Sequence, residues 1–89
     1  MRSFLDPEFL VLYRELPQEI RYQARAAYQR FKENPNHPGL RFNRLRTPSP
    51  LYSARVNDNY RVLGLLEGDE ITWFWIGTHA DYERYLATL

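Results

Sequence analysis

The sequence predicts a single α+β domain: a helical hairpin packed on a three- to four-stranded antiparallel sheet, followed by a short C-terminal helix. Apolar residues recur at helical spacing in the first third of the chain. In the rest they alternate with polar residues between clusters of turn residues. The 89 residues allow one domain, spanning 1–89, and their aromatic content of 16% supplies the large side chains that a small core needs.

Two helices are expected within residues 7–33. Asp6 and Pro7 favour a helix start, because Asp caps the N-terminus of a helix and Pro suits its first turn. Pro17 ends this short helix and begins the next, since Pro is tolerated in a first turn but not inside a helix. The second helix carries an apolar stripe that would face the core. The stripe consists of Leu16, Ile20, Ala24, Ala27, Tyr28 and Phe31.

The segment from residue 41 to residue 78 has the character of strands separated by turns. Branched and aromatic residues are frequent in it, and Pro, Gly, Asn and Asp interrupt it. The expected strands are a short edge strand within 41–46 and longer strands at 51–56, 60–66 and 71–76. Residues 81–89 are expected to form the terminal helix.

The turns set the expected register of the strands. A two-residue turn at 68–69 places Trp73 opposite Gly64, which is a sensible pairing because a large ring packs well over a strand glycine. The same register places Trp75 opposite Val62.

A three-residue turn at 57–59 would place Arg55 directly opposite Arg61. Like charges that face each other across strands destabilise the pair. Two interpretations remain open. Either Asp58 or a Glu neutralises the two arginines, or they converge on one phosphate, to which the planar guanidinium group is well matched.

Basic residues gather in the middle of the sequence, although the net charge is only +1. Residues 14–61 contain ten basic and four acidic side chains, whereas residues 62–89 contain one basic and five acidic ones. This pattern fits either a solvated, Arg-rich surface or a basic face for nucleic acid. On the second interpretation, Arg41, Arg44 and Arg46 are candidate RNA-binding residues.

The composition excludes several classes of site. The chain has no Cys, which rules out disulfides, Cys-based zinc sites and thiol nucleophiles. Two His residues are too few for a His-rich metal centre and no Gly-rich phosphate loop is present, so no metal or cofactor is expected. We expect neither a signal peptide nor a membrane span, and therefore a cytoplasmic protein without a membrane partner.

His79 is the candidate for proton transfer, because His is the side chain that titrates near neutral pH without help. It follows Gly77 and Thr78 at the end of the most apolar strand, and Asp81 lies close enough in sequence to orient it or balance its charge. The alternative is a surface His, or one satisfied by hydrogen bonds. Cleavage of an RNA strand by its own 2′-hydroxyl group needs a base for that hydroxyl and an acid for the leaving 5′-oxygen.

Tyr82 and Tyr85 are three residues apart on the expected terminal helix and so face the same way. One of them is expected to pack in the core. The other could stack on a nucleic-acid base, a contact that any base can make.

Three segments, in this order and spacing, resemble the RelE/ParE superfamily of bacterial toxin–antitoxin toxins. They are Leu16-Pro17-Gln18-Glu19-Ile20-Arg21, Arg55-Val56-Asn57-Asp58-Asn59-Tyr60-Arg61-Val62 and Ile76-Gly77-Thr78-His79-Ala80-Asp81. The last is similar to the ending of YafQ-like members. The resemblance covers roughly residues 13–86 and implies a helical hairpin packed on an antiparallel sheet.

The resemblance also implies a ribosome-dependent endoribonuclease that cuts mRNA, and that a cognate antitoxin holds inactive in an oligomeric complex. By position, Arg61 is similar to the family's Arg that contacts the scissile phosphate, Arg55 to an assisting basic residue and His79 to the catalytic His of YafQ-like toxins. Tyr85 falls at the position of a C-terminal Tyr, and Tyr82 lies one residue short of the aromatic in the YafQ ending.

Some features depart from the family pattern. The N-terminal strand is expected to be missing or reduced to residues 1–5. In a straight last strand His79 would point away from Arg61, so a bulge or strand end at Gly77-Thr78 is needed to bring them to one face. ParE-type relatives share the fold, lack the catalytic set and act on DNA gyrase. A non-catalytic gyrase inhibitor, or a decayed toxin fold that only binds a partner, is therefore the alternative.

Overall fold

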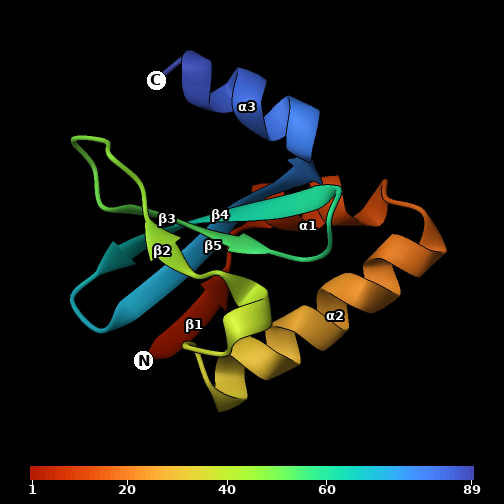
Figure 1. Ribbon diagram of the computed structural model, residues 1–89, viewed down its shortest axis with the longest axis horizontal. Coiled ribbons are helices and arrows are strands. Elements are labelled where there is room, and N and C mark those ends of the chain that lie inside the picture. Colours follow the sequence, from red (N-terminus) through yellow and green to blue (C-terminus); the bar gives the residue numbers. More distant parts are fainter.

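The computed structural model describes all 89 residues and confirms the predicted α+β fold class (Figure 1). Its elements are β1 (Arg2–Leu5), α1 (Pro7–Arg14), α2 (Gln18–Glu33), η1 (Pro38–Leu40), β2 (Asn43–Arg44), β3 (Leu51–Arg55), β4 (Tyr60–Glu67), β5 (Glu70–Thr78) and α3 (His79–Ala87). The element η1 is a single 3₁₀ turn. None of the helices combines the length and the apolar character that crossing a bilayer requires.

The sheet has five strands, in the order β1-β5-β4-β3-β2. The neighbours from β2 to β5 are antiparallel as predicted, and β1 adds in parallel to the outer edge of β5 with Arg2 opposite Glu70. The N-terminal strand is thus present in the reduced form that residues 1–5 allow. The prediction of three to four strands therefore falls short of the five observed, because four residues are too few to show a strand's alternation in sequence.

The expected edge strand within 41–46 is reduced to β2, the two residues Asn43–Arg44. Arg41 adopts a left-handed backbone conformation, with φ 47°, and ends η1 there. A residue with positive φ interrupts extended structure. The strand therefore cannot begin before it.

Both N-terminal helices form where the sequence predicts them. The Asp6 carboxylate accepts a hydrogen bond from Glu8 N at 2.9 Å and caps α1. The apolar stripe of α2 faces the sheet, since Ala24, Ala27 and Phe31 are buried.

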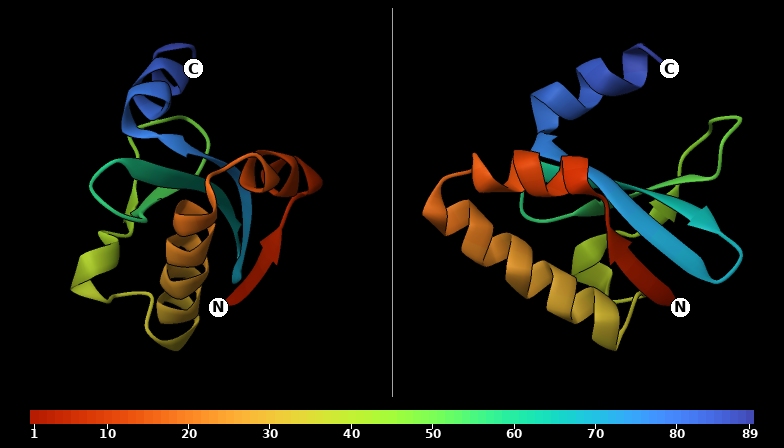
Figure 2. Two further views of the ribbon diagram at one scale, coloured as in Figure 1. Left: turned by 90° about the vertical axis from the view of Figure 1, so that its right-hand side faces the viewer. Right: turned by 180° about the vertical axis from the view of Figure 1, so that it is seen from behind.

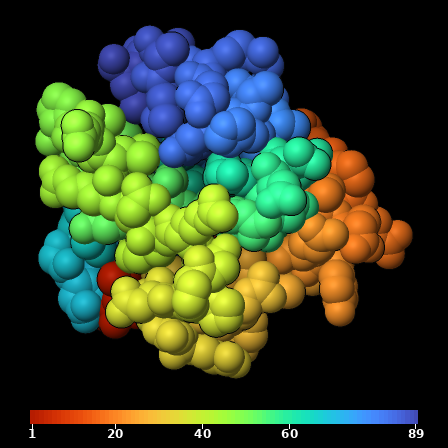
Figure 3. Space-filling view, in the orientation of Figure 1, coloured from red at the N-terminus to blue at the C-terminus, as the bar shows by residue number.

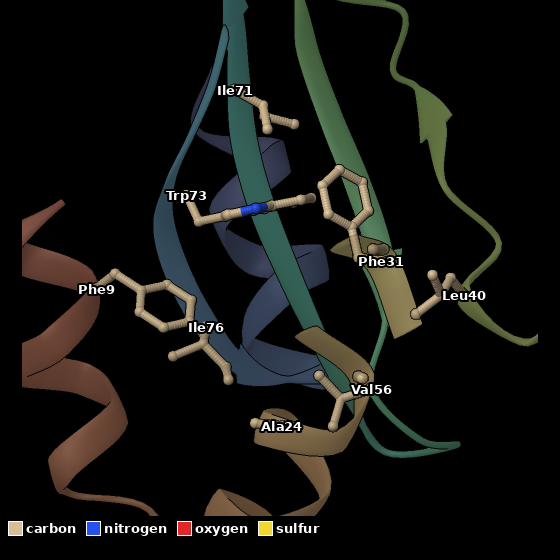
Figure 4. Close-up of a cluster of buried hydrophobic side chains, with 10 residues drawn as sticks. Phe9, Ala24, Phe31, Leu40, Val56, Ile71, Trp73 and Ile76 are labelled. Atoms are coloured by element: carbon tan, nitrogen blue, oxygen red, sulfur yellow. The ribbon is translucent and has the colours of Figure 1, made fainter. Parts of the chain in front are cut away.

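Helices cover both faces of the sheet (Figure 2). On one face, the hairpin of α1 and α2 packs over the main core, where the rings of Phe31 and Trp73 meet edge to face at 5.2 Å (Figure 4). On the other face, α3 packs over a smaller aromatic layer in which Trp75 lies 6.4 Å from Tyr82 and 5.7 Å from Tyr85.

A β-bulge at Phe74 sends the two tryptophans to opposite faces. Before it, Trp73 faces Gly64 as predicted; after it, Trp75 faces Leu63 and not Val62, so this part of the predicted register is wrong. A bulge inserts one extra residue into one strand, which moves every later residue to the other face. The sequence pattern of alternating apolar residues does not reveal this insertion, because β5 is apolar on both faces.

Gly64→Ala is expected to lower the free energy of unfolding by about 1–3 kcal/mol, the usual cost of adding a methyl group where neighbouring side chains leave no room for it. A Cβ atom at this position would lie 2.7 Å from Trp73 Cε3 and 3.0 Å from the Ile71 side chain, and both residues are almost fully buried. Thermal unfolding followed by circular dichroism should show a fall in Tm of roughly 4–8 °C per kcal/mol. Gly39→Ala is the control, because its Cβ would meet only the exposed His37 side chain at 3.3 Å. Equal stability of Gly64→Ala and wild type would contradict the packing described.

Candidate functional site

The turn between β3 and β4 is fixed by the side chain of Asn57. Its Oδ1 accepts hydrogen bonds from Asn59 N at 2.8 Å and Tyr60 N at 2.9 Å, and its Nδ2 donates to Gln23 Oε1 of α2 at 2.5 Å. An Asn that bonds the backbone ahead of it is a common way to close a turn. The predicted three-residue turn at 57–59 is therefore confirmed.

Three candidate residues are bonded to three successive residues of this turn. Arg55 Nη2 donates to the carboxylate of its middle residue at 2.5 Å, Arg61 Nη1 to the carbonyl of its first residue at 2.6 Å, and His79 N to the carbonyl of its last residue at 2.6 Å. The turn thus joins the ends of β3, β4 and β5. On the surface it lies between α3 and α2, turquoise between blue and orange in Figure 3. We call Arg55, Arg61, His79 and residues 57–59 the turn site.

Arg55 faces Arg61 in the sheet, as predicted, and is neutralised by Asp58. The hydrogen bond from Arg55 holds the pKa of the Asp58 carboxyl below its ordinary range, and the charge of Arg55 adds to this effect. The charges of Arg41 and Arg61 lower it further. With two arginines and one aspartate, the turn site keeps a positive charge.

Arg61 has donors left for an external anion. Its Nη1 donates to Asn57 O at 2.6 Å and to Tyr60 O at 3.0 Å, and no carboxylate pairs with it. A guanidinium group carries five N–H donors, so those on Nη2 and Nε remain unused within the chain. Of the two facing arginines, Arg61 is the better placed to bind a phosphate.

The bulge at Phe74 places His79 on the side of the strand that carries Arg61. Because of the bulge, Gly77 and not Ile76 faces Arg61, and His79 follows Gly77 by two residues. The strand therefore does contain the bulge that was expected. The bulge lies near the middle of β5, however, and not at Gly77-Thr78.

The carboxylate beside His79 is Glu83, and not Asp81 as the sequence suggested. His79 Nε2 lies 3.3 Å from Glu83 Oε1, one helical turn further on, whereas Asp81 pairs with Arg84. His79 and Glu83 are four residues apart, a spacing that brings side chains together on a helix. The sequence did not indicate this pair because the helix was expected to begin at residue 81. It begins at His79 because Thr78 Oγ1 caps it, and the imidazole stays about half exposed.

Tyr82 is buried, so the expectation that it stacks on an RNA base does not fit this structure. Its ring instead stacks on the imidazole of His79, with the ring centres 5.8 Å apart, and supports it from the core side. Tyr85 is half-buried and borders a shallow groove of about 350 Å³ together with Asp81. Tyr85 is therefore the accessible ring of the two.

Arg44 and Arg46 lie apart from the turn site. Arg44 pairs with Tyr52, toward the opposite end of β3 from Arg55, and Arg46 follows in the loop after β2. Both are exposed, and their role in binding RNA stays a prediction. No group of three or more His, Asp or Glu side chains that could hold a metal ion occurs in the chain.

Asp58→Asn is expected to increase the affinity of the turn site for an anion severalfold, because it frees the guanidinium of Arg55. The probe is a labelled single-stranded DNA oligonucleotide, which carries phosphates but no 2′-hydroxyl group, and the readout is fluorescence anisotropy. Asp69→Asn is the matched control, since Asp69 is an exposed acid in the turn between β4 and β5. Equal affinities for the two variants would contradict this prediction.

The same variant has an expected pH signature. Because the folded-state pKa of Asp58 lies below its ordinary value of 3.8, the pair with Arg55 adds stability above that pH. This contribution is lost as the pH falls through the lowered pKa. Wild type should unfold at a slightly higher temperature than Asp58→Asn at pH 7, and the difference should vanish in strong acid.

Comparison with known proteins identifies one family and several solved structures of similar fold. Residues 18–84 match the model of the ParE-like toxin domain. A chain of the RelB–RelE antitoxin–toxin complex from Methanococcus jannaschii is similar, with a TM-score of 0.72 and 18% identity over 92% of this chain and 96% of that one. YafQ from E. coli strain BL21(DE3) has a TM-score of 0.72 and 12% identity over 92% and 98% of the two chains. A mutant of the E. coli toxin RelE in the free state has a TM-score of 0.67 and 20% identity over 96% and 90%. No curated protein matches the sequence.

Proposed function

Because the chain belongs to the ParE-like toxin domain family, we propose that it is the toxin of a toxin–antitoxin system and that it cleaves mRNA on the ribosome. The observation that carries this proposal is the turn site, where the Arg61 guanidinium and the backbone N–H of His79 are bonded to one three-residue turn. Arg61 would bind the scissile phosphate, His79 would transfer protons, and Arg55 would assist Arg61.

In the proposed reaction the RNA supplies its own nucleophile. His79 takes the proton of the 2′-hydroxyl group, the freed oxygen forms a bond to the adjacent phosphorus, and the bond from phosphorus to the 5′-oxygen breaks. The leaving 5′-oxygen takes up a proton, returned by the imidazolium or by water. The products are a 2′,3′-cyclic phosphate and a 5′-hydroxyl group. Arg61 stabilises the charge that builds up on the phosphate oxygens during this exchange.

The surroundings of His79 support its proposed role. The Glu83 carboxylate lies 3.3 Å from Nε2, and together with the stacked ring of Tyr82 it restricts the orientation of the imidazole. The imidazole is about half exposed, so a substrate can reach it. Tyr85, the accessible ring on α3, is proposed to contact the RNA. Asp81 is paired with Arg84 and is not needed for proton transfer.

Primer extension on mRNA from a translating extract tests the proposal. Adding the toxin should produce new mRNA ends in actively translated messages, and blocking initiation should remove them. The upstream fragments should carry a cyclic or 3′-phosphate. Growth arrest in cells without any new mRNA ends would overturn the nuclease assignment.

A non-catalytic inhibitor of DNA gyrase is the second candidate. One observation favours it: Arg55 is already bonded to Asp58, and Arg61 to two carbonyl groups, as side chains with a purely structural role would be. A gyrase supercoiling assay separates the candidates. Inhibition of supercoiling by wild type and by His79→Ala alike would favour the gyrase inhibitor.

The proposed partner is a cognate antitoxin whose carboxylates reach Arg55 and Arg61. A relative of the same fold is known in an antitoxin–toxin complex, and the excess of basic over acidic side chains in residues 14–61 favours an acidic partner. We expect the Kd of this complex to rise with salt between 50 mM and 500 mM, because exposed charges are screened over about 8–10 Å at physiological ionic strength. Isothermal titration calorimetry at several salt concentrations measures this. A salt-independent complex that leaves both arginines exposed would refute the prediction.

A further inference from the structure

An apolar cavity of about 310 Å³ lies between the α1–α2 hairpin and the sheet. Phe9 and Trp73 approach this region from one side and Phe31 and Ala24 from the other (Figure 4). Protein interiors are normally close-packed, and an apolar cavity of about 150 Å³ is already enough to bind benzene. The space here is at the lower end of the range for sites that bind small molecules.

The cavity exists because small residues line it where two layers meet. Ala24 and Ala27 of α2 and Ala54 of β3 all face it, and each is nearly buried. An alanine leaves space that a leucine or phenylalanine at the same position would fill. The cavity therefore depends on alanines at three positions, two in α2 and one in the sheet.

Three polar contacts join the elements that line the cavity. The Tyr28 hydroxyl lies 3.0 Å from Ser3 Oγ, which in turn accepts from Trp73 Nε1 at 3.2 Å and ties α2 to β1. The Arg25 guanidinium donates to the Tyr13 hydroxyl at 2.6 Å and ties α2 to α1. Tyr13 and Tyr28 both line the cavity.

The charges around the cavity have one sign. Thirteen of the fifteen lining residues are hydrophobic, and the other two are Arg25 and Arg55. Arg55 is neutralised by Asp58, whereas Arg25 is exposed and has no carboxylate partner. An apolar interior with one unpaired guanidinium group at its boundary matches a molecule with a hydrocarbon chain and an anionic head.

We propose that this cavity binds an aliphatic monocarboxylic acid, with the hydrocarbon chain between α2 and the sheet and the carboxylate on Arg25 and the Tyr13 hydroxyl. This site shares only Arg55 with the turn site, and its occupancy does not depend on the proposed nuclease activity. A ligand there would fix the position of α2, whose Gln23 holds the turn through Asn57. Binding at the cavity is thereby connected to the geometry of the turn site.

Titration of the purified full chain with decanoate tests the proposal, with decanol as the uncharged comparison. Two readouts are independent of RNA cleavage. Decanoate at one hundred times its Kd should raise Tm by about 10 °C or more. It should also change the emission of Trp73, which lines the cavity, and the variant Trp75→Phe isolates that signal.

Two kinds of variant locate the ligand. Arg25→Gln should weaken decanoate binding by about tenfold and leave decanol unchanged, because only the carboxylate loses a charge-assisted hydrogen bond. Arg30→Gln on the same helix removes an equal charge away from the cavity and should change neither. Ala27→Leu should fill the space and abolish binding of both compounds. If Ala27→Leu does not fold, Ala54→Val reduces the cavity from the sheet side.

Four outcomes would overturn the proposal. The first is the absence of any saturable change in Tm or emission with decanoate. The second is full binding to the filled variant, which would place the ligand elsewhere. The third is an equal effect of Arg25→Gln and Arg30→Gln. The fourth is equal binding of decanol and decanoate to wild type, which would remove the preference for an acid.

Discussion

His79→Ala should reduce mRNA cleavage by about 10²–10⁴-fold, the usual contribution of a side chain that transfers a proton in the transition state. Growth arrest on expression should disappear with it. The fold should survive, because the His79 side chain is about half exposed and the bond that attaches this residue to the turn comes from its backbone N–H. Primer extension in a translating extract measures the rate, and circular dichroism measures the fold.

The matched control for His79 is the only other histidine, His37. It is exposed and accepts a hydrogen bond from Gly39 N at 3.1 Å at the start of η1, away from the turn site. His37→Ala should therefore cleave at the wild-type rate. If His79→Ala cleaves as fast as His37→Ala, His79 is not the proton-transfer group. If neither variant nor wild type produces mRNA ends, the nuclease proposal fails and the supercoiling assay becomes the next experiment.

Arg61→Ala should reduce cleavage by about 10²–10³-fold, the size of effect seen when one charge-stabilising donor is removed from an active site. The guanidinium group would be lost from the phosphate in the transition state. The same substitution also removes the hydrogen bonds to Asn57 O and Tyr60 O, so some loss of stability is expected as well.

Arg61→Lys separates the two effects. It keeps the positive charge but cannot hold a phosphate and the turn carbonyls through one planar group, so cleavage should still fall at least tenfold while Tm changes less than in Arg61→Ala. Arg30→Ala removes an exposed arginine in the last turn of α2, to which no role in RNA binding is assigned, and is the control. A variant Arg61→Lys with wild-type cleavage would show that only charge is required, and wild-type cleavage by Arg61→Ala would exclude Arg61 from catalysis.

The fold could be predicted from sequence because local signals agreed with one another. The Asp6-Pro7 start, the Pro17 break and the stripe of α2 all describe helices, and the three-residue turn fixes Arg55 opposite Arg61 without further information. The bulge at Phe74 could not be predicted. It depends on which face of β5 each ring packs against, and an apolar strand of nine residues allows more than one register.

The candidate site was predicted in its residue types but not in its contacts. Arg55, Arg61 and His79 do meet at one turn. The bonds of Arg61 and His79 to backbone carbonyl groups of that turn, however, could be identified only from the structure. Glu83 approaches His79 because α3 begins earlier than expected. The burial of Tyr82 depends on the crossing of α3 over Trp75, which no local pattern encodes.

The parallel pairing of β1 with β5 has a consequence for how the chain folds. Arg2 and Glu70 are neighbours in the sheet although about three quarters of the sequence lies between them, and β5 pairs with both β1 and β4. Such non-local pairing is slow, because a long loop must close before the contact forms. While β5 is still inside the ribosome, the nascent chain lacks the strand that completes the sheet. His79, which follows β5 directly, is then missing as well. The sheet can therefore be completed only after β5 has been synthesised, and the turn site, which needs the end of β5, is among the last parts of the molecule to form.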